Sequence, residues 1–173
     1  MIIMQLIKKV GHLFLVISLM GTVLFSGVSL AASENQLPPA PTEGTSANNP
    51  TYGTSSPMDA SSIESTQYLM SGESFISFVS GTRVTVSGNT KAYFPVDSIA
   101  VDLYLQRWDA SKGQWVDVLY VGEFKNNNSS VVSGSMDVNV VSGYYYRTHS
   151  YHWVSEGGTV EQNHSYSSYI YVN

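Results

Sequence analysis

The stretch GYYYRTHSYHWV, residues 143–154, holds the densest group of side chains that could recognise another molecule. Aromatic rings offer flat apolar area with a polar tip, which suits stacking on sugar rings or docking a protein. The stretch predicts a β-strand, because aromatic and β-branched residues dominate it and glycines bracket it. Alternate side chains of a strand share a face, and the set that we place outward includes Tyr145, Arg147, His149 and Tyr151.

Two other expected strands, residues 98–108 and 165–172, carry outward aromatic side chains of the same kind. If these strands neighbour residues 143–154 in a sheet, their outward side chains converge on one exposed surface. The predicted binding surface consists of Tyr104, Trp108, Tyr145, Arg147, His149, Tyr151, Tyr169 and Tyr171. The alternative is that these side chains only cover one another as cross-strand pairs, each stabilising the sheet by roughly 0.2–1 kcal/mol.

Histidines in the C-terminal region are candidate metal ligands, with Glu156 and Glu161 near them. Ligands must converge on one point, but His149 and His152 have opposite parity on one strand. We therefore expect no metal site and interpret His149, His152 and His164 as scattered surface histidines. No cofactor is expected.

Catalysis has little support in the sequence. Asp102, Asp117 and His149 could form part of a triad with one of the many serines, but no nucleophile elbow, phosphate loop or HExxH motif is present. The acidic residues 97, 102 and 109 are spread along one expected strand and its flanks, which does not suit a pair of converging carboxylates. We predict that the protein is not an enzyme.

Composition narrows the class of protein further. The chain has 173 residues, 43% of them hydrophobic, which is enough for one packed domain. It has no cysteine, so disulfides, thiolate zinc sites and a lipid-anchor cysteine are excluded. Its formal charge is −5, which argues against nucleic acid as a partner, because phosphate binding needs clustered lysine and arginine.

The N-terminal residues predict export. Lys8 and Lys9 precede a mostly apolar run, residues 10–30, and small residues follow it at the position that a signal peptidase reads. We interpret residues 1–31 as a signal peptide cut after Ala31 or Ala32. The alternative is a retained membrane anchor, because the run is long enough to span a bilayer. After cleavage no stable membrane span is expected.

Residues 32–66 contain five of the six prolines, together with many Ser, Thr, Asn and Gly residues. Such a stretch buries too little apolar surface to offset its ordering entropy, and it is predicted to be a disordered linker. Residues 67–173 then show period-two patterning between turn signals and no helical stripe. The expected strands are residues 73–80, 83–94, 98–108, 114–124, 131–141, 143–154 and 165–172, with a turn at Asn126–Ser129. The inward face of residues 114–124 is open, because Trp115, Val116, Val118 and Leu119 compete for it. The side chains expected inside on the other strands include Val84, Val86, Ile99, Val101, Leu103, Leu105, Val132, Met136, Val138, Tyr144, Tyr146, Val154, Tyr166, Ile170 and Val172.

Seven short strands over about a hundred residues predict an all-β fold, a seven-stranded antiparallel immunoglobulin-like sandwich. The strand at 143–154 resembles strand F of immunoglobulin-like and fibronectin type III domains, in which a tyrosine near the start forms the tyrosine corner. Gly143-Tyr144 stands where that motif would lie. Because the chain has no cysteine pair, the resemblance is closer to the disulfide-free fibronectin-like branch.

A second resemblance covers nearly the whole chain. A leader ending in VSLAA and a Pro/Ser/Thr-rich linker are followed by SGES, LYLQRWDASKGQWVDV, GYYYR and a final YVN. This order resembles an uncharacterised family of small secreted proteins from Gram-positive bacteria, with a domain of unknown function. The resemblance implies export and one compact domain, and it implies no catalytic residue and no ligand.

The preferred function is therefore a secreted, non-catalytic module for adhesion or recognition, with a cell-wall or extracellular glycan or protein as its partner. One alternative is a secreted effector such as a small toxin, an antibacterial protein or an enzyme inhibitor. Another is a purely structural surface protein without a soluble ligand.

Overall fold

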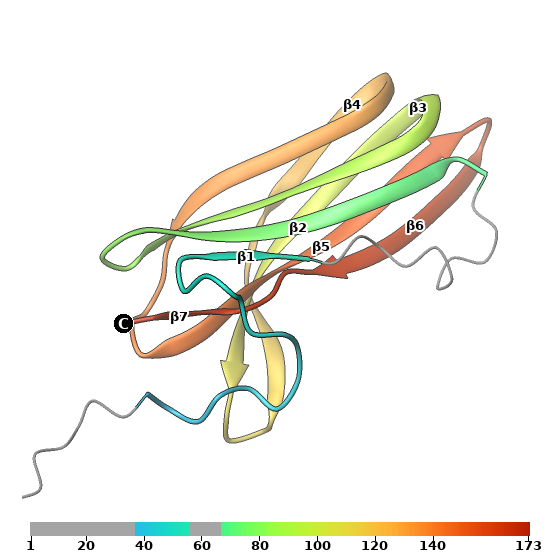
Figure 1. Cartoon of the computed structure of the whole chain (residues 1–173). Coiled ribbons are helices and arrows are strands. Elements are labelled where there is room, and N and C mark those ends of the chain that lie inside the picture. The colour runs from blue at the N-terminus through green and yellow to red at the C-terminus, as the bar shows by residue number, and fades with distance from the viewer. Residues whose placement is uncertain (1–36, 56–66) are drawn as a thin grey trace, which may run out of the picture. The chain divides into compact units, whose positions relative to one another are not determined.

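The structure, a computed structural model, describes residues 37–55 and 67–173 (Figure 1). The expected signal peptide, residues 1–31, and the linker positions 32–36 and 56–66 lie outside the described residues. The described part contains no helix, and so it includes none that is long and apolar enough to cross a membrane.

All described strands belong to one antiparallel sheet, which confirms the all-β, antiparallel prediction. The strand order is β1-β2-β3-β5-β6, with β4 paired to β3 and β7 paired to β5. The strands are β1 Tyr52–Thr54, β2 Leu69–Ser80, β3 Arg83–Asp109, β4 Gln114–Asn139, β5 Tyr144–Glu156, β6 Thr159–Tyr166 and β7 Ile170–Val172.

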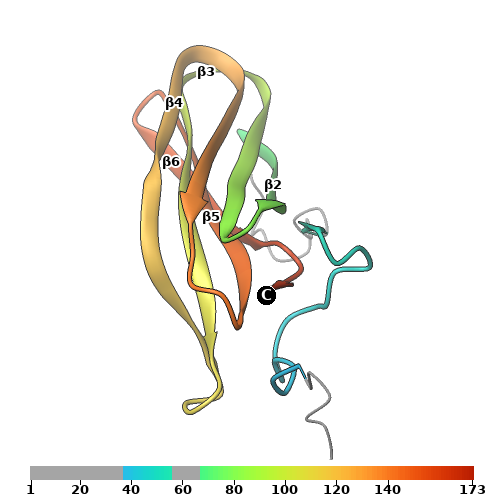
Figure 2. The same ribbon diagram turned by 90° about the vertical axis from the view of Figure 1, so that its left-hand side faces the viewer.

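The sheet curls because its two longest strands, β3 and β4, bend together (Figures 1 and 2). The first part of β3, residues 83–92, pairs with β2, and residues 98–107 pair with β5. The β3–β4 register shifts between Lys91 and Val96, where the bend lies. The two halves of the sheet therefore face each other, and β2 contacts β5 and β6 across the core.

The bend corrects two sequence predictions. Residues 83–94 and 98–108 were expected as separate strands, as were 114–124 and 131–141 with a turn at Asn126–Ser129 between them. Each pair is one continuous strand, because β3 and β4 stay hydrogen-bonded around the bend through Val96↔Ser129. Asn128 takes up the change of direction with φ 49°, a left-handed conformation that asparagine tolerates.

The core lies between the two halves of the sheet. Its buried side chains alternate along the strands as predicted and include Val84, Val86, Ile99, Val101, Leu103, Leu105, Val132, Val138, Tyr146, Val154, Ile170 and Val172. Three residues expected inside are exposed instead: Met136, Tyr144 and Tyr166. For Tyr166 the reason is a break at residues 167–169, which splits the expected last strand into β6 and β7 and reverses the alternation.

The hydroxyl that bonds back to the chain near the start of β5 is also not the expected one. Tyr146, two residues beyond the predicted corner position at Tyr144, donates from its hydroxyl to the backbone oxygen of Val141 over 2.8 Å. Tyr146 is buried while Tyr144 is 40% exposed, so only the former needs an internal partner.

Residues 37–55 are not a disordered linker, so that part of the prediction is wrong. β1 pairs with β2, and the backbone N–H of Ala47 donates to the oxygen of Tyr169 over 3.0 Å. Tyr169 in turn donates to the oxygen of Thr45 over 2.9 Å. At the break between β6 and β7, the backbone N–H of Ser167 still donates to Thr148 of β5, whereas Ser168 and Tyr169 find their backbone partners in residues 37–55. We call residues 37–49 the N-terminal strap.

Candidate functional site

The outward side of the half-sheet formed by β3, β5, β6 and β7 carries the predicted binding residues. β3 pairs with β5, and β5 pairs with β6 and β7, so the neighbouring strands that the prediction required are present. The predicted side chains lie in one band of touching rings, which we call the aromatic face: Tyr104, Trp108, Tyr145, Arg147, His149, Tyr151, Tyr169 and Tyr171, joined by Trp115, His164 and Tyr166.

The exposure of this face differs from the prediction at one end. Trp108, Tyr145 and Tyr169 are 5%, 8% and 8% exposed, and they form a second buried cluster with Trp115 and Tyr171 packed against it. These three side chains are therefore not accessible for binding. The other predicted residues, Tyr104, Arg147, His149, Tyr151 and Tyr171, are half-buried.

The N-terminal strap covers the buried end. The hydroxyl of Tyr145 donates to the backbone oxygen of Pro38 over 2.9 Å, and Nε1 of Trp115 donates to the oxygen of Glu43 over 3.0 Å. Pro41 is itself buried. A proline-rich segment that lacks apolar periodicity thus finds its order by lying on aromatic rings that belong to the sheet.

Arg147 stands in the middle of the aromatic face and is fixed from several sides. Its guanidinium carbon lies 4.4 Å from the centre of the Trp115 ring and 4.5 Å from that of Tyr166. Nε donates to Oε1 of Gln106 over 2.7 Å, and Nε2 of Gln106 donates to Asp117 over 2.8 Å. Burial lowers the pKa of Arg147 to about 10, so the side chain remains charged at neutral pH.

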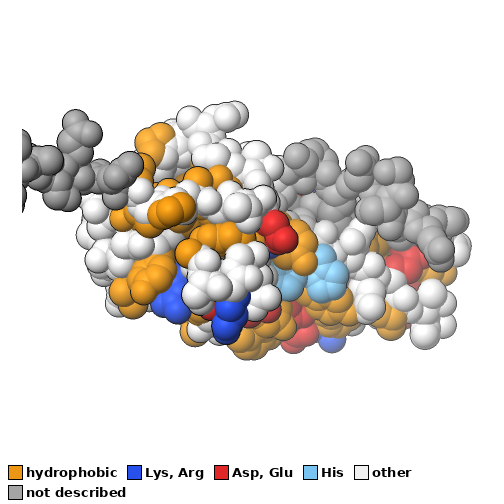
Figure 3. All heavy atoms as spheres, turned by 90° about the horizontal axis from the view of Figure 1, so that it is seen from below, with side chains coloured by type: hydrophobic (Ala, Val, Ile, Leu, Met, Phe, Trp, Pro, Cys, Tyr) orange, Lys and Arg blue, Asp and Glu red, His pale blue; other side chains and the backbone are white. Residues whose placement is uncertain are grey.

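His149 lies in a stack of rings beside Arg147. Its imidazole is 5.4 Å from the Tyr104 ring and 4.7 Å from the Tyr166 ring, and Nδ1 is 3.4 Å from Asp117. Nε2 faces Nδ1 of His164 at 2.8 Å. Burial lowers the pKa of His149, although Asp117 opposes this. Figure 3 shows histidine side chains among hydrophobic ones on one surface of the molecule.

No third ligand completes this histidine pair. Within residues 37–55 and 67–173, no three His, Cys, Asp or Glu side chains gather closely enough to hold a metal ion. The catalytic triad considered from the sequence, an aspartate, His149 and a serine, is also not formed. The two ring nitrogens of His149 face Asp117 and His164, and neither faces a serine.

His152 is not a surface histidine, contrary to the expectation. It is fully buried, with Nδ1 2.8 Å from Oγ1 of Thr90 and Nε2 2.7 Å from Oγ of Ser165. Because the Thr90 hydroxyl donates to the oxygen of Ala100, Nδ1 carries the proton and Nε2 accepts from Ser165. Burial lowers the pKa of His152 to about 3, which makes it a weak base.

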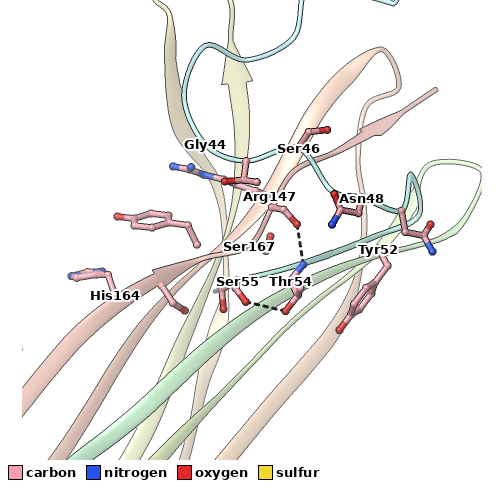
Figure 4. Close-up of a pocket in the computed structure, with 14 residues that line it drawn as sticks. Gly44, Ser46, Asn48, Tyr52, Thr54, Ser55, Arg147, His164 and Ser167 are labelled. Carbon is pink, nitrogen blue, oxygen red and sulfur yellow. Dashed lines mark hydrogen bonds between the residues drawn. The ribbon is translucent and has the colours of Figure 1, made fainter. Parts of the chain in front are cut away.

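A cavity of about 610 Å³ adjoins the aromatic face where the strap, β1 and the β6–β7 break meet (Figure 4). Tyr52, Arg147, His164 and Tyr166 supply rings and a charge to its wall. The rest of the lining is backbone and small hydroxyl or amide side chains, from Gly44, Thr45, Ser46, Asn48, Asn49, Thr54, Ser55, Ser165, Ser167 and Ser168.

Sequence reasoning missed most of this cavity. Composition places residues 44–55 in the linker, and period-two alternation places Tyr166 in the core. Alternation does not fix the direction of Trp115, which pairs directly with Trp108 across the β3–β4 hairpin. Residues opposite each other in a hairpin share a face, so the expected outward direction of Trp108 could have placed Trp115 on the same face.

Fold and site together define an all-β protein whose outer sheet face carries stacked rings, a held arginine and a polar cavity. Residues 30–168, most of the chain, match a family described as a family of unknown function, DUF6147, and the chain belongs to that family. Comparison with curated proteins and with solved structures gives no match.

Proposed function

We propose that this protein is a non-catalytic recognition module that binds glycans in the cavity beside the aromatic face. The observation that supports this most directly is the composition of the cavity wall, which combines hydroxyl and amide side chains with the rings of Tyr52 and Tyr166. Sugars present apolar C–H faces to rings and hydroxyls to polar groups, and such a wall offers both.

A glycan is favoured over a protein partner by the shape and polarity of the accessible part. The most deeply buried part of the aromatic face, around Trp108, Tyr145 and Tyr169, is already covered by the strap. What remains open is a hollow where polar and apolar surface are mixed, whereas the centre of a protein interface is apolar and filled by large anchors.

Two finer features belong to the proposal. Export with loss of residues 1–31 is supported by the basic start, the apolar run and the small residues after it. An immunoglobulin-like sandwich of the fibronectin type III kind is supported by the facing halves of the curled sheet, by the Tyr146 hydroxyl bond and by the absence of cysteine.

An array of soluble glycans and cell-wall polysaccharides tests the proposal. The protein should be retained on at least one glycan, and Tyr166→Ala should weaken retention tenfold or more by removing a cavity wall. Tyr93→Ala is the matched control, because Tyr93 is 59% exposed and lies outside the cavity. Lack of retention by the unchanged protein, or equal loss in both variants, would refute the proposal.

A further inference from the structure

The guanidinium of Arg147 carries a charge that no acidic side chain neutralises directly. Its only hydrogen bond within the described part of the chain is from Nε to the neutral amide of Gln106. The ion pairs in that part of the chain involve Arg83, Lys112 and His149 instead. Both terminal nitrogens, Nη1 and Nη2, therefore keep their donors for another acceptor.

The surroundings hold these donors in place. Trp115 and Tyr166 lie within 4.5 Å of the guanidinium carbon, which restricts the plane of the group. Gly44 closes one side, since a Cβ added there would stand 3.0 Å from Nη1, and its φ of 85° suits glycine. Figure 4 shows Arg147 beside Gly44 at the edge of the cavity.

The cavity supplies no negative charge of its own. Its lining contains Arg147 and His164 but no Asp or Glu residue. Glu43 and Asp117 lie close enough to act on the Arg147 charge through space, but neither forms an ion pair with it, and Asp117 accepts from Gln106 instead. A half-buried cation that lacks a direct partner is costly, and an anion in the cavity would relieve that cost.

We infer that the cavity binds an acidic sugar, whose carboxylate accepts two hydrogen bonds from Nη1 and Nη2 of Arg147. This inference rests on the proposed glycan function and adds the charge of the ligand. The planar fork of arginine matches a carboxylate in a bidentate pair, and its fixed orientation lowers the entropy lost on binding. The hydroxyls of the sugar meet the side chains of Thr45, Ser46 and Asn48.

The test compares two ligands that share the same sugar chain and differ in whether the carboxyl group is ionised or esterified. The probes are an oligogalacturonate and its neutral methyl ester, titrated into the full-length protein and followed by calorimetry. The acid should bind about ten- to a hundredfold more tightly than the ester, as charge-assisted hydrogen bonds imply. Arg147→Met, which keeps an unbranched apolar stem between the rings, should reduce acid binding to the level of the ester.

Arg107→Met is the matched control. Arg107 also lies over a ring, 4.5 Å from the centre of Tyr144, but it is outside the cavity lining. It should leave both affinities unchanged. Arg147→Lys keeps the charge without the fork and should recover only part of the preference for the acid, which a purely structural role of Arg147 would not produce.

Two outcomes separate this inference from the proposed function. Equal affinity for acid and ester, with tight binding of both, overturns the acidic-sugar inference and leaves glycan binding intact. If no glycan binds, the inference fails as stated, and acetate titrated against the NMR signal of the Arg147 Nε–H shows whether a simple anion site is left. Unchanged acid preference in Arg147→Met also overturns the inference.

Discussion

Buried His152 makes the stability of the fold sensitive to mild acid. The imidazole is enclosed by Thr90 and Ser165, and a Cβ at Gly72 would lie only 2.4 Å from its ring. Its pKa is lowered from 6.5 to about 3, first by burial and then by the nearby His164 and His149. The unfolded chain therefore binds a proton that the folded chain does not bind between pH 6.5 and 3.

The sign and size of the effect follow from this difference. Stability is highest above pH 6.5 and falls as the pH drops, because protonation favours the unfolded chain. With an unfolded pKa of 6.5, the loss between pH 7 and 5 is about 2 kcal/mol, and its limiting slope is about 1.4 kcal/mol per pH unit. Carboxylates with ordinary pKa values near 4 contribute little in this window.

Urea denaturation at pH 7, 6 and 5 measures the free energy of unfolding directly. His152→Gln removes the titrating group and should flatten the dependence, although the variant starts from a lower stability. His149→Gln is measured beside it, since burial also lowers the pKa of His149 and adds to the loss in the same direction.

A free energy of unfolding that stays constant from pH 7 to 5 would refute this reasoning. So would a His152→Gln variant with the same pH dependence as the unchanged protein, because the proton uptake would then belong to another group.

Three further predictions concern stability, each measured by urea denaturation at pH 7. Glu161→Ala should lower the free energy of unfolding by about 1–2 kcal/mol, because its carboxylate accepts hydrogen bonds from the backbone N–H groups of residues 67–69 over 2.7–2.9 Å. Glu123→Ala, the control, should leave it unchanged, and an equal loss in both variants would contradict this role of Glu161. Tyr146→Phe should lower the free energy of unfolding by about 1 kcal/mol, because it removes the hydroxyl that donates to Val141, and Tyr144→Phe should change it very little. The reverse result would contradict the assignment of this hydrogen bond to Tyr146. Gly53→Ala should cost about 1–3 kcal/mol, since the new Cβ would lie 2.2 Å from the oxygen of Ser168, and unchanged stability would show that β1 shifts freely.

Period-two patterning was sufficient to predict the sheet and most of its core. Val84, Val101 and Ile170 are buried as expected, because an apolar residue on the wrong face of a strand would leave a gap in the core. The condition for a shared outward surface, that residues 98–108 and 165–172 neighbour residues 143–154, is met by the pairing of β5 with β3, β6 and β7.

The errors share a physical origin, since each depends on contacts distant in sequence. Asn126–Ser129 has turn chemistry, but continued pairing with β3 makes it a bend within β4. The strap has the composition of a disordered segment, and only the break at residues 167–169 gives its backbone partners. Burial of Trp108 and Tyr145 follows from that docking, so local alternation could not predict it.

The strap also sets the N-terminal boundary of a fragment that keeps the properties of the whole protein. A fragment beginning at residue 67, where patterning alone would place the domain, loses Pro38 and Glu43 and uncovers Trp108, Tyr145 and Tyr169. Such a fragment would bind non-specifically to column matrices, to dyes and to other copies of itself through the exposed aromatic rings. This non-specific binding could be mistaken for binding of a ligand. Proteolysis between the strap and β2 that releases the strap would have the same effect, so a fragment that keeps the covered rings begins at residue 37.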